Sequence, residues 1–184
     1  MMTYKKLLWL MALAFIFTGC NKYYVLSTAS QPSVHYGKKQ RVIGVEKVVV
    51  PKYLFKREIA VAKSSSEITF LGSAVWAEDL DYGLTQRLIA FLQKKFNQPN
   101  VYAYPWGLNT NPTVKVKVQI TRFIAEGDKV YLDANWRVFN MKTGQRKAKL
   151  FSTSIATKDD AQSIVDTMDR VFGELEEAIA KGLR

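Results

Sequence analysis

The chain has 184 residues, with 27 Lys and Arg against 16 Asp and Glu, one His, one Cys and a formal net charge of +11. Its length predicts a single domain, and its 48% of apolar residues exclude a natively disordered chain. One Cys and one His can neither form an internal disulfide nor supply the roughly four ligands of a structural zinc site. The basic excess indicates nucleic acid or an acidic membrane surface as a partner.

The N-terminus has the pattern of a secretory signal. Lys5 and Lys6 precede an unbroken apolar run from Leu7 to Phe17. At about 1.5 Å per residue, this run covers only about half of the roughly 30 Å hydrocarbon core of a bilayer, too little for an ordinary transmembrane helix. We therefore predict a signal peptide over residues 1–19 and one exported domain over residues 20–184.

The residues at the end of the apolar run, Phe17-Thr18-Gly19-Cys20, resemble a bacterial lipobox. This resemblance implies cleavage before Cys20, attachment of a diacylglycerol to its sulfur, and acylation of the new amino terminus by a chain such as palmitate. Two or more acyl chains anchor a protein stably, so Cys20 is the predicted lipidation site, and we expect no cofactor besides these covalent lipids. Export removes nucleic acid as a partner. The dispersed basic residues then face anionic lipid headgroups, an acidic protein or simply solvent.

The first half of the exported chain contains short β-prone runs. Residues 23–27 either form a strand of the sheet or belong to the tether. Residues 41–50 are rich in β-branched side chains and predict a strand that ends at Pro51, because proline cannot donate to a sheet ladder. Two shorter strands are predicted over 59–63 and 67–70.

The hydrophobic period then changes from that of a strand to that of a helix. Leu80, Leu84 and Leu88 repeat every four residues, and this spacing predicts a helix with one apolar face over residues 77–96. Residues 101–106 predict a further strand, which ends at a proline and a polar loop.

The clearest strands lie in the second half of the chain. Apolar and polar residues alternate over 113–121 and 130–140, and more weakly over 146–157. The tight connection Glu126-Gly127-Asp128 between the first two predicts an antiparallel hairpin. Together the three strands predict an antiparallel meander.

A long helix with a continuous apolar stripe is predicted over residues 158–181. Thr157 and Asp160 have the spacing of a capping box at its start. The predicted elements combine into an α+β fold, a mainly antiparallel sheet of five or more strands with two amphipathic helices packed on one face.

The sequence contains no pattern of catalytic or metal-binding residues. His35 lies in a polar loop without a nucleophile to serve, and the carboxylates of Glu78, Asp79 and Asp81 favour the positive end of the helix dipole. A Gly-rich phosphate loop and a metal-binding His and Glu spacing are both missing. We therefore predict no catalytic residue and no metal site, and a protein that is not an enzyme.

Aromatic residues outside the predicted core are the better functional candidates, because exposed aromatic side chains mark binding surfaces. The alternative is that some of them pack at the edge of the core. The predicted partner-binding residues are Tyr102, Tyr104, Trp106, Tyr131 and Phe139.

Several segments, in their order and spacing, resemble the PqiC (YmbA-type) family of ABC-type transport auxiliary lipoproteins. The similarity extends over nearly the whole exported chain. The matching segments are the lipobox at Cys20, Tyr23-Tyr24-Val25-Leu26, Ile43-Gly44-Val45 with Val50-Pro51-Lys52-Tyr53-Leu54, and Trp76-Ala77-Glu78-Asp79-Leu80 at the start of the first helix.

The resemblance implies a periplasm-facing auxiliary component of an ABC/MCE-type system for intermembrane lipid transport and membrane integrity. Its implied partners are an MCE-domain protein, the associated transporter membrane components and further copies of itself in a homo-oligomeric ring. Asn21 is not the Asp that retains enteric lipoproteins on the inner membrane, so an outer-membrane anchor is expected.

A second hypothesis is a lipoprotein regulator or assembly factor of a peptidoglycan synthase or of an outer-membrane assembly complex. Its size, anchor and small α/β body would look the same. The partner that co-purifies with the protein separates the two hypotheses.

Overall fold

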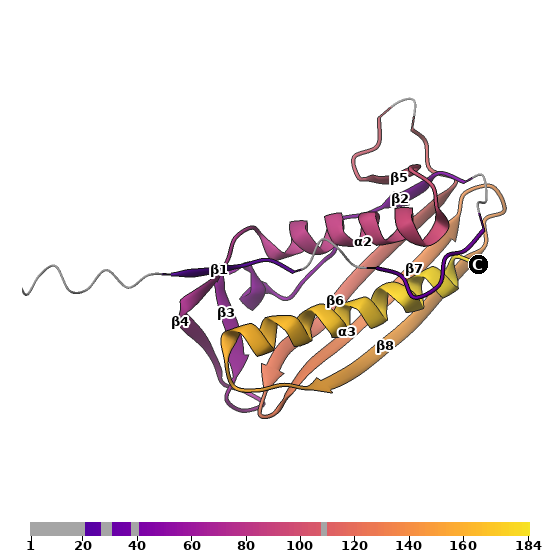
Figure 1. The fold of residues 1–184 in the computed structure, drawn as a ribbon. Helices are drawn as coiled ribbons and strands as arrows, with labels where there is room; N and C mark the ends of the chain where they lie inside the picture. The colour runs from indigo at the N-terminus through magenta and orange to yellow at the C-terminus, as the bar shows by residue number, and fades with distance from the viewer. Residues whose placement is uncertain (1–20, 27–30, 38–40, 108–109) are drawn as a thin grey trace, which may run out of the picture.

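The computed structural model describes residues 21–26, 31–37, 41–107 and 110–184. The predicted signal peptide and the predicted lipidation site, Cys20, lie outside the described residues. The elements follow one another along the chain as shown in Figure 1. They are β1 (Lys22–Tyr24), β2 (Ile43–Val45), the 3-10 helix η1 (Lys52–Phe55), β3 (Glu58–Ala62), β4 (Ile68–Trp76), α2 (Leu80–Phe96), β5 (Val101–Ala103), β6 (Val114–Glu126), β7 (Lys129–Asn140), β8 (Arg146–Ala156) and α3 (Ala161–Gly182).

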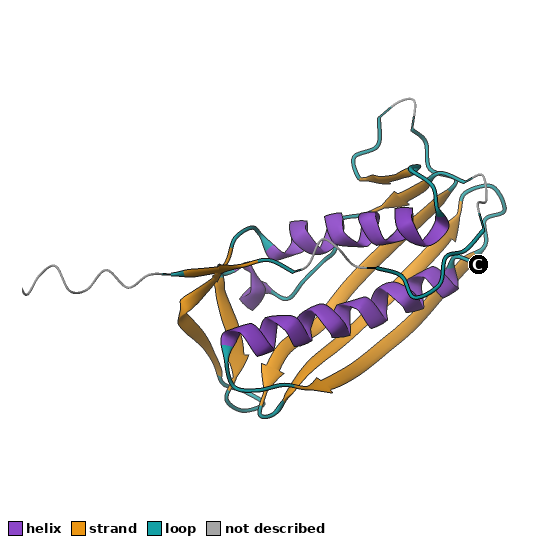
Figure 2. Ribbon diagram, in the orientation of Figure 1, coloured by secondary structure: helices purple, strands orange, loops and turns teal. Residues whose placement is uncertain are grey.

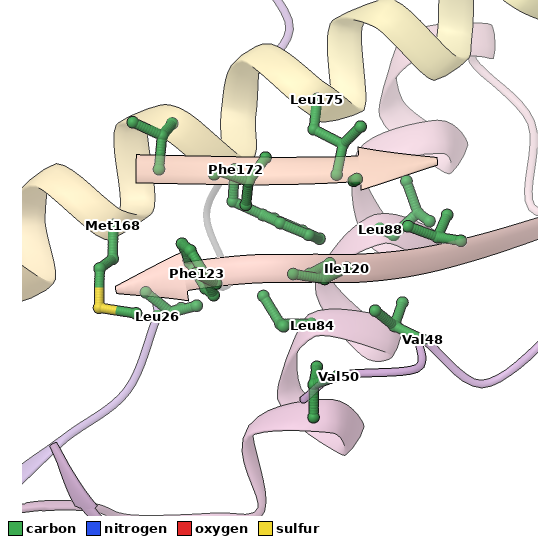
Figure 3. Packing of buried hydrophobic residues seen from close by; sticks show 14 of the residues in the cluster. Leu26, Val48, Val50, Leu84, Leu88, Ile120, Phe123, Met168, Phe172 and Leu175 are labelled. Atoms are coloured by element: carbon green, nitrogen blue, oxygen red, sulfur yellow. The ribbon is translucent and has the colours of Figure 1, made fainter. Parts of the chain in front are cut away.

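The molecule has two layers. Its strands form one eight-stranded sheet, and α2 and α3 lie side by side over one face of that sheet (Figures 1 and 2). The α+β class and the placement of both helices on one face are confirmed. Apolar side chains of the helices and of the covered sheet face form the core, part of which is drawn in Figure 3. Within the described chain, no helix combines the length and the apolar character that crossing a membrane requires.

The predicted meander of β6, β7 and β8 is confirmed and forms the largest part of the sheet. β7 pairs antiparallel with β6 along its whole length and with β8 on its other side. Because strand side chains alternate between faces, one apolar set enters the core, as Val116, Val118 and Trp136 do. The connecting turns place Gly127 and Gly144 at φ values of 60° and 71°, which glycine adopts without steric cost.

The other edge of β6 carries parallel pairings that the sequence analysis did not predict. β2 pairs with the first residues of β6, and β3 pairs with the last residues of β6. Between these two pairings, Val49 forms a single bridge to Gln119 of β6. The predicted continuous strand over 41–50 is therefore wrong, because Val48 N–H donates to the Thr85 hydroxyl of α2, 2.9 Å away, instead of to a sheet ladder. The three longest ladders remain antiparallel, so the sheet is mixed but mainly antiparallel.

The segment just after the predicted anchor joins the sheet. Residues 22–24 form β1, which pairs in parallel with the end of β4. Leu26, two residues after the end of β1, belongs to the same buried apolar cluster as Phe123 and Met168 (Figure 3). Of the two alternatives left open by the sequence, the structure therefore selects the strand for these first residues.

Both helices begin later than predicted. Asp79 has an extended backbone and precedes α2, so that helix starts at Leu80. At α3 the prediction of a capping box was wrong, because Asp160 is itself the N-cap and accepts a hydrogen bond of 2.8 Å from Ser163 N–H. Hydrogen bonding to Ser163 holds the pKa of Asp160 below its ordinary value.

Candidate partner-binding face

The sheet face opposite the helices carries the polar positions of the strand alternation. Cross-strand partners point to the same face, so the register of the ladders shows which side chains gather there. Gly44 of β2 lies opposite both Tyr102 of β5 and Lys115 of β6, Lys115 lies opposite Phe139, and Phe139 lies opposite Arg146. One row of this open face thus crosses five strands and includes two of the predicted aromatic residues.

The loop after β5 adds two more of the predicted residues to this row. Trp106 packs on Gly44 so closely that a Cβ at that glycine would lie 2.6 Å from Cε2 of the indole. The indole N–H donates to the Tyr102 carbonyl oxygen at 3.4 Å, and the Tyr104 ring stands edge-on to the indole at 5.0 Å between centroids. Glycine at position 44 therefore allows the loop to fold back onto the sheet.

Basic side chains cover the aromatic rings of this row. Lys115 Nζ lies 4.9 Å from the centre of the Trp106 ring, and the Arg146 guanidinium lies 5.0 Å from the centre of the Phe139 ring. A cation over an aromatic face is attracted by the ring quadrupole. The row therefore alternates cations with flat aromatic rings instead of presenting bare aromatic side chains.

A second row of the open face adds further cations. Lys117 of β6 lies directly opposite Arg137 of β7, and both side chains are exposed. Glu46 forms an ion pair with Lys117 at 3.5 Å. We call Lys115, Lys117, Arg137 and Arg146 together the basic face.

The sequence analysis did not predict the basic face, because the four residues are spread over thirty-two positions of the chain. The signal was present in the alternation itself, since Lys115, Lys117 and Arg137 occupy polar positions of the two best-defined strands. Their proximity depends on the register between β6 and β7, which the alternation alone does not determine.

Tyr131 lies apart from the other four predicted residues. It is eight residues before Phe139 on β7, which at about 3.4 Å per residue is about 27 Å away. Its ring is covered by the Arg122 guanidinium at 3.9 Å. The partner-binding role of all five residues stays a prediction, but four of them share one end of the open face.

A groove of about 1000 Å³ lies near the predicted anchor, between β1 and the start of α3. Tyr23 and Tyr24 form one wall, and the other carries both signs of charge. Its charged lining residues are Lys158, Asp166, Asp169 and Arg170. This mixture favours no single class of ligand.

Comparison with known families shows to which family the chain belongs. Residues 24–180 match the model of a family described as the ABC-type transport auxiliary lipoprotein component. The chain belongs to this family. The family name places the protein in the bacterial envelope, as a lipoprotein that assists an ABC-type transporter.

Solved structures share the fold of this auxiliary lipoprotein. A crystal structure of an uncharacterized protein is 21% identical in sequence, with a TM-score of 0.73 over 90% of this chain and 99% of that chain. A DUF330 protein from Xanthomonas campestris is 11% identical, with a TM-score of 0.74 over 86% of this chain and 92% of that chain. No curated protein matches the sequence.

Proposed function

We propose that this auxiliary lipoprotein is a non-enzymatic, lipid-anchored adaptor that couples an ABC transporter to an MCE-domain protein in lipid transport between the two membranes. The observation that carries the proposal is the family match over residues 24–180, which comprises nearly all of the domain after the predicted lipidation site. The family supplies the transporter as a partner. The lipid cargo and the MCE partner go beyond the family match and belong to the proposal.

The position of β1 supports the role of an adaptor held close to a membrane. A single residue, Asn21, separates Cys20 from the first residue of β1. Two residues of chain span at most about 7 Å, so a lipidated Cys20 would hold the domain against the headgroup layer without a flexible linker. The outer membrane is the proposed location, because Asn21 replaces the Asp of inner-membrane retention.

Two ends of the domain are well separated. One carries β1, next to the predicted anchor, and the other, the aromatic end, carries Tyr102, Tyr104, Trp106 and Phe139. In Figure 1 the chain enters β1 at the left, whereas the loop after β5 lies at the upper right with the first residues of β6. A domain anchored through β1 would therefore direct its aromatic end away from the membrane. This arrangement suits a protein that receives a partner in the periplasm.

The test is a pull-down of the tagged, lipidated protein from its own cells in mild detergent, with partners identified by mass spectrometry. We expect an MCE-domain protein or an ABC transporter subunit to co-purify. A Cys20→Ser variant should leave the membrane fraction and recover less of the transporter. Recovery of a peptidoglycan synthase or an outer-membrane assembly complex in place of the transporter would refute the proposal and favour the regulator hypothesis.

A further inference from the structure

We propose that the basic face docks on a carboxylate-rich protein surface of the transporter component that the lipoprotein assists. The identity of that partner rests on the proposed function. The chemistry of the contact, an acidic protein surface, follows from the charges and the shape of the face itself.

The four cations of the basic face lie close together although like charges repel one another. Lys117 and Arg137 lie directly opposite one another on neighbouring strands, and like charges in that position destabilise a sheet. Lys115 and Arg146 flank them in the adjacent row. Among the ion pairs within the described residues, the one between Glu46 and Lys117 reaches this face. The face therefore keeps an excess of positive charge that an acidic partner would neutralise.

The composition of the face and the burial of its rings favour a protein over a bilayer. Binding to a bilayer increases with the apolar area that enters it, but the rings of Trp106 and Phe139 are half-buried and lie beneath Lys115 and Arg146. They are not free to insert between lipids. Arg137 and Arg146, with the rings of Trp106 and Phe139, are of the residue types that are enriched at protein interfaces.

The position of the face also separates it from the predicted membrane of attachment. β6 enters the sheet at the end of the molecule away from β1 (Figure 1). At physiological ionic strength, interactions between exposed charges are screened beyond about 8 Å. Headgroups around a lipidated Cys20 would therefore not neutralise the basic face.

The acidic side chains of α3 are not available to pair with this face of a second copy. The carboxylates of α3 already have partners, since Glu177 binds Lys95 at 2.7 Å, Asp169 pairs with Arg87, and Glu174 accepts from the Thr153 hydroxyl at 2.6 Å. A two-fold contact between two basic faces would oppose like charges. These observations favour a different protein over a second copy.

The experiment places a benzophenone amino acid at Val49, an exposed residue whose bridge to Gln119 puts it two positions from Lys117, on the side of β6 away from β8. The full-length lipoprotein is irradiated in its own cells, and the cross-linked product is identified by mass spectrometry. We expect a cross-link to the transporter component that is recovered in the pull-down. The double substitution Lys117→Glu and Arg137→Glu should reduce the yield at least about tenfold, because it turns attraction into repulsion.

A matched variant controls for charge and folding. Lys52→Glu with Lys63→Glu makes the same change of charge at two exposed positions outside the basic face, and we expect its cross-link yield to equal that of the wild type. A single Arg137→Gln substitution removes the like-charge opposition to Lys117. We expect it to raise the thermal midpoint while lowering the yield, a combination that loss of folding cannot produce.

The remaining outcomes overturn the proposal in distinguishable ways. If the transporter co-purifies but the probe at Val49 forms no cross-link, or forms one that survives the charge reversal, the docking face is wrong and the proposed function stands. A cross-link to a second copy or to lipid also rejects an acidic protein partner. A cross-link to a cell-wall synthase rejects the proposed function and, with it, the partner named here.

Discussion

Two basic side chains of α2 are buried between the helices. Arg87 and Lys95 are only 2% and 1% exposed. Arg87 forms ion pairs with Glu176 and Asp169 of α3 and stacks over Phe172, and Lys95 Nζ binds Glu177 at 2.7 Å. Buried charges require such partners, because an isolated charge loses its hydration. These contacts therefore fix the position of α2 relative to α3.

Substitution of Arg87 by Met should lower the free energy of unfolding by about 3–5 kcal/mol, because the fully buried Glu176 loses a cation. Urea denaturation measures the change. The double substitution Arg87→Met and Glu176→Met should recover most of the loss, since it removes the charge that is left behind. Lys117→Met disrupts an exposed ion pair and should change stability by less than about 1 kcal/mol. An equal loss in both single variants would show that burial does not decide the effect.

At the scale of elements, α3 packs along β7 and β8 with its apolar stripe. Its C-terminal end approaches the sheet closely at one glycine. A Cβ at Gly182 would overlap with Cη2 of Trp136, whose side chain is buried in the core. Gly173 lies in the same helix, but a Cβ there would meet only the Arg87 guanidinium, at an ordinary contact distance of 3.6 Å.

These two glycines should respond oppositely to substitution by alanine. Gly182→Ala forces Trp136 or the helix to shift and should destabilise the protein by about 1–3 kcal/mol. Gly173→Ala gains helix propensity without a clash and should stabilise it by up to about 1 kcal/mol. Thermal unfolding followed by circular dichroism measures both. Equal effects of the same sign would contradict the close packing of α3 on β7.

For the whole molecule, the edge strand β8 bears on the homo-oligomeric ring that the family resemblance implies. β8 is eleven residues long and, within the described residues, pairs with a strand on one side only. An edge strand of this length is a template for pairing with another chain. Leu150 in its middle is 89% exposed, which is unusual for a large apolar side chain. We therefore expect copies that assemble as the family resemblance implies to meet at β8.

Substitution of Leu150 by Lys should reduce the oligomeric fraction of the detergent-solubilised lipoprotein, because a charged side chain at an edge opposes strand pairing. The stability of the monomer should change by less than about 0.5 kcal/mol, since the leucine packs against little in one copy. Light scattering coupled to size-exclusion chromatography measures the mass. Phe55→Lys, at another exposed apolar residue, should leave the mass unchanged. An unchanged mass for the Leu150 variant would exclude β8 as the contact.

The clearest elements of local structure follow from the sequence. The two-residue alternation of β6 and β7 and the four-residue spacing of Leu80, Leu84 and Leu88 depend only on which residues face the core. All three elements formed, although β6 continues past the predicted end at residue 121 to Glu126 and α2 begins at Leu80 instead of residue 77. The family was also recognisable, because its segments follow one another along the chain. Phe139 falls on the open face for the same reason, since its position is polar in the alternation of β7, whereas Tyr104 and Trp106 reach that face through the loop after β5.

The tertiary structure alone decided which distant segments meet. β2 and β3 pair with β6 in parallel across more than fifty residues, a choice that core packing makes and that periodicity does not encode. Arg87 and Lys95 look like surface residues in the sequence until α3 brings their carboxylates beside them. The basic face forms for the same physical reason, because strand register places Lys117 opposite Arg137, and register depends on the whole sheet.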